Sequence, residues 1–189
     1  MFQKLQLASA SPRRKEILEN LGFVVEINPA HIDETPHPDE TPENYVRRMA
    51  EEKNRAVQNQ QNLPVVSADT AVILDHQILG KPNDHQDAKR LLQLLSGREH
   101  IVLTAVCVSF QQHYLSDISK STVLFTPLSD KEIETYIQTG EPMDKAGAYG
   151  IQGRGGMFVQ HLSGSFTGVM GLPVFETGNL LKILYEKFC

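Results

Sequence analysis

Two adjacent arginines, Arg13 and Arg14, occupy the predicted start of a helix close to the N-terminus. Ser11 is a favourable N-cap, and Pro12 suits the first helical position, where a missing N–H costs nothing. Cations in a first turn oppose the helix dipole, so the stability of the helix does not require them. An anion would explain them, because backbone N–H groups, the hydroxyls of Ser9 and Ser11 and two guanidinium groups would converge on it. The segment therefore predicts a phosphate site; a solvated arginine pair is the alternative.

Lys53 is a charged residue at a position that should be apolar. A helix is predicted over residues 41–59, and at about 100° per residue its apolar side chains fall within an arc of roughly 140°. Lys53 falls near the middle of this arc, whereas Asn54 falls on the opposite, polar side. Such a lysine must extend to solvent, pair with a carboxylate or reach into a pocket, where it would suit a phosphate. The apolar arc comprises Tyr45, Val46, Met49, Ala50, Ala56 and Val57.

Asp69 interrupts an apolar, β-branched run at residues 65–74. A carboxylate inside such a strand is expected to be partly buried, and burial without compensation is costly. It should therefore accept hydrogen bonds, pair with a cation or bind a metal ion. Two interpretations stay open: an aspartate that accepts from backbone amides at a strand break, or a metal ligand or general base.

Three further segments carry weaker signals. Asp33 and Glu34 place carboxylates in a polar loop, and Lys81 stands at a turn after the Asp69 segment. For each of these, a solvated loop charge is the alternative. Residues 144–156 contain five glycines in thirteen residues, which implies unusual backbone dihedrals or close backbone approach. Their spacing is not a dinucleotide fingerprint, so a ligand-binding loop and a plain flexible loop both stay open.

Taken together, these residues are an arginine pair, two lysines and acidic residues able to hold a cation. The set suits a polyphosphate accompanied by a hard divalent metal ion. The spacing alone does not separate a hydrolase from a phosphotransferase or from a nucleotide-binding module.

The composition is that of an ordinary globular protein, with 189 residues, 40% hydrophobic and 22% charged. A net charge of -5 argues against a broad nucleic-acid interface, which requires a basic face. The two cysteines, Cys107 and Cys189, form no disulfide framework or metal-binding spacing, as expected in a reducing compartment. Because the sequence has no signal-like or membrane-spanning run, we expect a cytoplasmic protein without membrane contact.

Strand and helix signals alternate along the chain, which predicts a mixed α/β fold. We expect a central sheet flanked by helices, with two lobes around a cleft, and a single domain over residues 1–189. Strands are predicted at residues 4–8, 23–27, 65–74, 101–110, 114–125 and 157–162. Helices are predicted at residues 11–21, 41–59 and 173–188, between Asp84 and Gly97, and after the capping box of Ser129 and Glu132.

Six short segments, which include the charged residues described above, resemble the Maf family of nucleoside triphosphate pyrophosphatases. They occur in the family's order, and the resemblance covers essentially the whole chain. The motif Ala148-Tyr149-Gly150-Ile151-Gln152-Gly153 is similar to the motif of the branch that acts on dTTP and UTP, and differs from that of the branch that acts on 7-methyl-GTP. The segments are Ser9-Ala10-Ser11-Pro12-Arg13-Arg14, Asp33-Glu34, Glu52-Lys53, Ser67-Ala68-Asp69-Thr70, Gly80-Lys81-Pro82 and residues 144–153.

The resemblance implies hydrolysis of a pyrimidine nucleoside triphosphate to the monophosphate and pyrophosphate, in the housecleaning of the nucleotide pool. It implies an elongated mixed sheet with two lobes around the substrate cleft, as in Maf and ITPase-like folds. It also implies a divalent cation (Mg²⁺ or Mn²⁺), a cytoplasmic location and, in many members, a homodimer. Among the residues, it implies Asp69 as proton acceptor, and Arg13, Thr70 and Gln152 as residues that shape substrate choice.

The other candidate site residues suit this chemistry. Ser9, Arg14, Lys53 and Lys81 would bind phosphate oxygens around a pyrophosphate leaving group, and Glu34 with Asp69 would hold the metal ion. Because a metal-bound carboxylate is a poorer base, the two roles of Asp69 compete. Gln152 carries both donors and an acceptor, as needed to recognise the edge of uracil or thymine.

The alternative is a nucleotide-binding regulator of cell division or septum formation that lacks catalysis. Asp69, Glu34 and the two lysines count against it, because a pure sensor does not need the acid pair.

Overall fold

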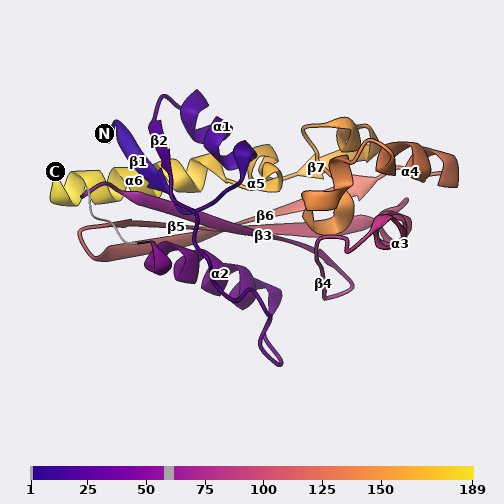
Figure 1. Cartoon of the computed structure of the whole chain (residues 1–189), viewed down its shortest axis with the longest axis horizontal. Helices are drawn as coiled ribbons and strands as arrows, with labels where there is room; N and C mark the ends of the chain where they lie inside the picture. The colour runs from indigo at the N-terminus through magenta and orange to yellow at the C-terminus, as the bar shows by residue number, and fades with distance from the viewer. Residues whose placement is uncertain (1, 58–61) are drawn as a thin grey trace.

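A mixed sheet of seven strands flanked by helices forms the protein, as the computed structural model shows for residues 2–57 and 62–189 (Figure 1). The strand order is β2-β1-β3-β5-β6-β7, and β4 pairs with β3. Strand β1 pairs in parallel with β2 and β3, whereas the remaining pairs are antiparallel. The strands are β1 (Lys4–Leu7), β2 (Val24–Ile27), β3 (Val65–Leu74), β4 (Gln77–Leu79), β5 (Glu99–Phe110), β6 (His113–Phe125) and β7 (Val159–Ser163).

Helices cover the sheet at both of its ends. They are α1 (Pro12–Asn20), α2 (Pro42–Ala56), α3 (His85–Leu95), α4 (Asp130–Ile137), α5 (Phe166–Met170) and α6 (Val174–Phe188), with the 3-10 helices η1 (Glu141–Asp144), η2 (Ala146–Ala148) and η3 (Arg154–Phe158). The long strands β3, β5 and β6 run along the long axis of the molecule (Figure 1). The predicted fold class is therefore confirmed.

The predicted elements differ from the structure mainly at their ends. Met157 and Phe158, predicted as strand, belong to η3, and β7 begins only at Val159. Strand β4 and helix α5 escaped prediction, because three and five residues carry too little hydrophobic periodicity. Helix α2 ends at Ala56; the predicted end near Asn59 lies outside the described residues.

Helix α2 follows its hydrophobic pattern except in its last turn. Asn54 is buried, which corrects its assignment to the polar side of the helix. Its Nδ2 donates to two backbone carbonyl oxygens of β3 and β5, at 3.0 Å each. Ala56, predicted in the apolar arc, is exposed, because the helix ends there. The buried face comprises Val46, Met49, Ala50, Lys53 and Asn54.

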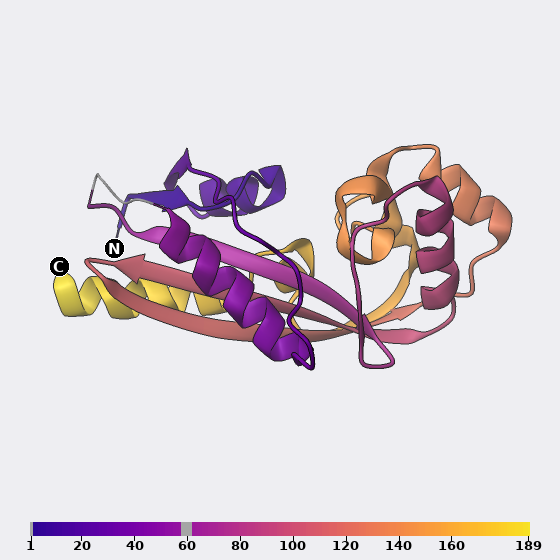
Figure 2. The same ribbon diagram turned by 60° about the horizontal axis from the view of Figure 1, so that its bottom comes forward.

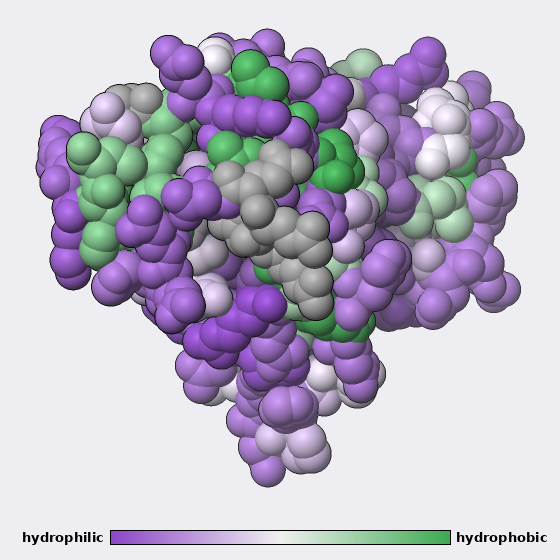
Figure 3. Space-filling view, turned by 60° about the vertical axis from the view of Figure 1, so that its left-hand side comes forward, coloured by the Kyte–Doolittle hydropathy of each residue, from purple (hydrophilic) through white to green (hydrophobic). Residues whose placement is uncertain are grey.

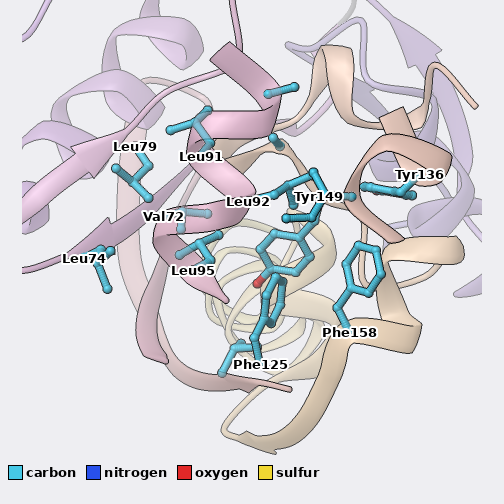
Figure 4. Packing of buried hydrophobic residues seen from close by; sticks show 14 of the residues in the cluster. Val72, Leu74, Leu79, Leu91, Leu92, Leu95, Phe125, Tyr136, Tyr149 and Phe158 are labelled. Atoms are coloured by element: carbon cyan, nitrogen blue, oxygen red, sulfur yellow. The ribbon is translucent and has the colours of Figure 1, made fainter. Parts of the chain in front are cut away.

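Two lobes lie along the sheet (Figure 2). Each has its own cluster of buried side chains. In the first lobe, β1 and α1 pack with α6 on one half of the long strands. In the second, α3, α4 and the 3-10 helices pack on the other half. Figure 4 shows the aromatic centre of this second lobe, where the rings of Tyr149 and Phe125 meet edge to face with centroids 4.7 Å apart.

His100, on β5, packs edge to face against Phe125 and Tyr149 of this aromatic centre. We expect it to make the stability of the protein sensitive to acid. Its Nε2 is 2.9 Å from the hydroxyl of Tyr149, and burial lowers the pKa of His100 from 6.5 to about 4. Between these values the unfolded chain binds a proton that the folded protein does not. Above pH 6.5 the titration of His100 therefore costs the folded protein no stability. As the pH falls below this value, the free energy of unfolding decreases, by up to ~3 kcal/mol.

Urea unfolding from pH 7 to pH 4 measures this loss. We expect the free energy of unfolding to fall less steeply with pH in His100→Gln than in the wild type, because glutamine does not titrate. An equal slope in the two proteins contradicts the assignment.

On the face shown in Figure 3 the surface is mostly hydrophilic, with hydrophobic residues gathered in patches. Across residues 2–57 and 62–189, no helix is both long enough and apolar enough to cross a membrane. Both cysteines are free thiols, as the sequence predicts.

Candidate functional site

A cleft of about 640 Å³ lies between the two lobes, beside a break in the pairing of β3. On this edge β3 pairs with β1 at Val65 and Val66, and with β4 only from Val72 onward. Within the described chain, residues 67–71 have no strand partner on this side, although β5 pairs with them on the other. Successive side chains of a strand point to opposite faces. The open edge therefore allows two neighbouring residues, Asp69 and Thr70, to line the same cleft.

Every site residue proposed from the sequence lies on the wall of this cleft. The tertiary structure brings together residues from α1, the loop before α2, α2 itself, β3, the turn after β4 and the glycine-rich segment. They are Ser9, Arg13, Arg14, Glu34, Lys53, Asp69, Thr70, Lys81 and Gln152.

Lys53 lies between the two carboxylates of the cleft, those of Asp69 and Glu34. Its Nζ lies 2.7 Å from Oδ1 of Asp69 and 2.8 Å from Oε1 of Glu34. The side chains of Lys53 and Asp69 are each 10% exposed, and that of Glu34 is 52% exposed. The lysine on the apolar face of α2 therefore pairs with carboxylates inside the cleft, and does not extend to solvent.

The two carboxylates beside Lys53 differ in proton affinity. Burial raises the pKa of Asp69, and the charge of Lys53 only partly offsets this effect. At Glu34 burial also opposes ionisation, but the hydrogen bond and charge of Lys53 outweigh it and lower the pKa. A buried carboxylate with a raised pKa accepts protons more readily, as a general base must. This chemistry favours Asp69 over Glu34 as proton acceptor.

The loop that carries Glu34 is fastened to α2. Arg48 binds both carboxylate oxygens of Glu40 at 2.7 Å and donates to the carbonyl oxygen of Thr35 at 3.1 Å. The hydroxyl of Tyr45 donates to the carbonyl oxygen of Glu34 at 3.0 Å. These contacts hold an otherwise irregular loop so that Glu34 meets Lys53.

Arg14 and Ser9 lie at the N-terminal end of α1. The guanidinium of Arg14 donates to the carbonyl oxygen of Gly171 at 2.8 Å, to Oγ of Ser9 at 3.1 Å and to Oγ1 of Thr70 at 3.4 Å. Since a guanidinium has five N–H donors, others remain for a phosphate. Oγ of Ser9 also accepts from the backbone N–H of Ser11 at 3.2 Å, which leaves its own hydrogen free to donate.

Arg13 bridges the two lobes across the cleft. Its NH1 lies 2.8 Å from Oδ2 of Asp144, whose Oδ1 lies 2.6 Å from Nζ of Lys145. Burial of Asp144 opposes ionisation, but its hydrogen bonds from Lys145 and Arg13 prevail and lower its pKa to about 2. An incoming anion would compete with Asp144 for Arg13.

The glycine-rich segment packs mainly against the protein itself. A Cβ at Gly153 would lie 2.5 Å from a carboxylate oxygen of Glu141, and one at Gly147 would lie 3.0 Å from the side chain of Val72. These glycines therefore permit close packing within the second lobe. The exposed side chain of Gln152 projects from this segment and lines the cleft, and exposed Lys81 lies on the same wall.

Sequence reasoning gave no individual role to several residues of the site. Asp144 and Lys145 stand in a matched segment, but the contact of Asp144 with Arg13 spans 131 positions and has no local signal. Tyr45 was predicted only as part of the apolar face of α2, and Arg48 only as part of its polar face. Their contacts with the loop before α2 depend on how that loop folds back on the helix.

The cleft offers few ligands for a metal ion. Among the described residues, no three acidic, histidine or cysteine side chains gather into a metal-binding group. Asp69 and Glu34, the two predicted ligands, share one lysine and supply hard oxygen donors. Mg²⁺ is commonly held by one or two carboxylates, with substrate phosphates and water completing its shell. The donor set fits a metal ion that arrives with a phosphorylated ligand.

The fold and the cleft define a class: an open mixed α/β sheet with cationic and acidic side chains gathered at an unpaired strand edge. Two solved structures share the fold with this chain. The Ham1 protein of Staphylococcus aureus aligns with a TM-score of 0.50 at 15% identity, over 97% of this chain and 98% of that one. A HAM1 protein from Coxiella burnetii aligns with a TM-score of 0.52 at 13% identity, over 98% and 100%. At such identities the likeness shows the fold alone.

The chain belongs to the Maf family, since the family model described as Maf-like protein matches residues 4–184. A Haemophilus ducreyi relative named "Nucleoside triphosphate pyrophosphatase" is 55% identical, over 96% of this chain and 95% of that protein. A Pasteurella multocida relative named "dTTP/UTP pyrophosphatase" is 55% identical over 93% of both. A Neisseria gonorrhoeae relative with the same name is 50% identical over 95% and 93%. The resemblance identified from the sequence is confirmed.

Proposed function

We propose that this protein hydrolyses the pyrimidine nucleoside triphosphates dTTP and UTP to the monophosphate and pyrophosphate, as a housecleaning enzyme of the nucleotide pool. The names of its relatives support this activity. The observation that carries it for this chain is the buried Lys53–Asp69 pair, 2.7 Å apart, on the wall that also holds Arg13, Arg14 and Lys81.

The reaction needs a proton acceptor and a site for negative charge. A water oxygen bonds to the α-phosphorus, the bond from this phosphorus to the bridging oxygen breaks, and pyrophosphate leaves with that oxygen. Asp69 accepts the proton of the water, helped by its raised pKa. Ser9, Arg14, Lys53 and Lys81 bind phosphate oxygens and stabilise the charge that develops on them.

Glu34 and Asp69 are the residues that would hold a divalent cation, Mg²⁺ or Mn²⁺; at Asp69 this role would compete with proton acceptance. When bound, such an ion neutralises charge on the triphosphate oxygens. Lys53 keeps both carboxylates together in the free protein, because its Nζ contacts both, and its charge favours the ionised form of each.

Substrate choice is assigned to Arg13, Thr70 and Gln152. The amide of Gln152 carries both a donor and an acceptor for the edge of uracil or thymine, and its exposed position on the cleft wall supports this role. Arg13 is held beside this wall by Asp144.

Residues 1–189 act in this proposal as one domain, because β3, β5 and β6 extend through both lobes. A homodimer and a cytoplasmic location stay predictions from the family. Sedimentation at micromolar concentration tests the dimer.

A panel of nucleoside triphosphates, assayed with Mg²⁺ and with Mn²⁺, tests the activity. We expect dTTP and UTP to be turned over fastest, with pyrophosphate and monophosphate in equal amounts and no orthophosphate. Orthophosphate as the only phosphate product, or no turnover of dTTP and UTP, contradicts the proposal. Triphosphate that binds and stays intact would instead favour the non-catalytic regulator.

A further inference from the structure

Glu141, at the start of η1, lies outside the cleft wall but holds the segment that carries Gln152. Its Oε1 accepts from the hydroxyl of Tyr136 at 2.9 Å and from the backbone N–H of Gly155 at 3.1 Å. Its Oε2 accepts from the backbone N–H of Arg154 at 3.0 Å. Both carboxylate oxygens are therefore bound to one short stretch of chain and to the tyrosine beside it.

Tyr136 secures the other end of the same stretch. It is buried in the second lobe, and its hydroxyl accepts from the backbone N–H of Gly150 at 3.1 Å while donating to Glu141. Hydrogen bonds to Tyr136 and Glu141 thus hold both ends of residues 150–155, and Gln152 lies between the two bonded ends. We call this arrangement the tyrosine–glutamate grip. A further bond from the N–H of Gly153 to the carbonyl oxygen of Gly150, at 3.1 Å, closes the turn.

The glycines of this stretch make room for the pair. A Cβ at Gly153 would lie 2.5 Å from Glu141 Oε1, and one at Gly155 would lie 2.8 Å from the hydroxyl of Tyr136. Burial of Glu141 opposes ionisation, but the backbone N–H groups of Arg154 and Gly155 prevail and lower its pKa. The carboxylate stays charged at neutral pH and keeps these strong hydrogen bonds.

A glutamine that selects a base must present its side-chain amide to that base in a defined position. Uracil and thymine present an N–H donor beside a carbonyl acceptor, whereas cytosine presents the reverse. A glutamine amide has both kinds of group, and turning it by half a rotation would match cytosine equally well. Because that rotation takes place within the side chain, the backbone contributes in another way: it sets where the amide meets the base, and a shift of residues 150–155 would move both its donor and its acceptor away from the edge of uracil.

We infer that Glu141 and Tyr136 are positioning residues that set base selection by fixing the backbone of Gln152. This inference rests on the proposed function, in which Gln152 contacts the base. Neither residue is required to touch the substrate.

The test compares UTP with CTP as substrates of the full-length protein and of four variants: Glu141→Gln, Tyr136→Phe, Gln152→Ala and the double variant Glu141→Gln/Gln152→Ala. We expect Glu141→Gln to lower the ratio of kcat/KM for UTP over CTP by ~10-fold or more, mainly through KM for UTP. The double variant should be no less selective than Gln152→Ala, because both changes act through one side chain. Glu134→Gln is the matched control, since this α4 carboxylate pairs with Lys89 at 2.7 Å, is 58% exposed, and should leave the ratio unchanged.

Amide hydrogen exchange of residues 150–155 gives a readout that needs no turnover. We expect exchange there to be faster in Glu141→Gln than in the wild type, with the rest of the second lobe unchanged. If Glu141→Gln does not fold, Tyr136→Phe tests the same grip by removing a single hydroxyl.

An unchanged ratio in Glu141→Gln and Tyr136→Phe overturns the inference. Additive losses in the double variant, or an unchanged ratio in Gln152→Ala, also overturn it. If the wild type turns over no triphosphate, the proposed function fails separately. Unchanged exchange in Glu141→Gln would then show that the grip fails as well.

Discussion

Asp69→Asn is expected to lower the rate of dTTP and UTP hydrolysis at least ~100-fold, the usual effect of removing a general base. Asparagine keeps the size of the side chain but accepts no proton from water, and it leaves Lys53 with a weaker partner than the carboxylate 2.7 Å away. The measurement is steady-state pyrophosphate release at saturating substrate. Turnover close to the wild-type rate would remove Asp69 from the catalytic role.

A binding measurement separates this loss from a failure to fold. The variant should still bind dTTP in calorimetry, because the remaining cations of the cleft are untouched. The wild-type rate should fall as the pH drops below the raised pKa of Asp69, because the protonated acid is no longer a base. A variant that has lost both binding and its unfolding transition would report on folding alone.

Lys53→Met is expected to destabilise the protein by about 3–5 kcal/mol, because it leaves a buried carboxylate without its partner. Lys53 and Asp69 are each 10% exposed, whereas Glu34 is 52% exposed, so the loss comes mainly from Asp69. Removing Lys53 also raises the pKa of Asp69 further. The folded variant then binds a proton that the unfolded chain does not, so the destabilisation should be smaller at pH 5 than at pH 8.

Urea unfolding measures this effect, with two matched variants. The double variant Lys53→Met/Asp69→Asn should recover most of the lost stability, since no buried charge is left unpaired and Glu34, which also loses its partner, is 52% exposed. Lys81→Met, at an exposed lysine of the same cleft, should change stability by no more than ~0.5 kcal/mol. A loss in Lys53→Met as small as in Lys81→Met would show that the pair contributes little.

The sequence signal was strong where one residue conflicted with a regular pattern. Lys53 conflicts with the apolar face of α2, and Asp69 with an apolar strand, so both could be selected without a structure. Ser11 and Pro12 marked the start of α1 for a similar reason, since caps are local chemistry. Asn54 was misassigned because helix periodicity does not register a buried amide that binds the backbone of two neighbouring strands.

The sequence by itself determined the longer helices and strands, the fold class and the types of side chain available, because periodicity and caps act over a few residues. Only the tertiary structure decided that, among the described residues, β3 lacks a strand partner at 67–71 on one edge, although β5 pairs with them on the other. This open edge lets Asp69 and Thr70 line one cleft. It also decided that Lys53 meets both acids, that Arg13 meets Asp144, and that the glycines enclose Glu141. These contacts join positions far apart in the chain, and only the packing of the complete sheet and its helices brings such positions together.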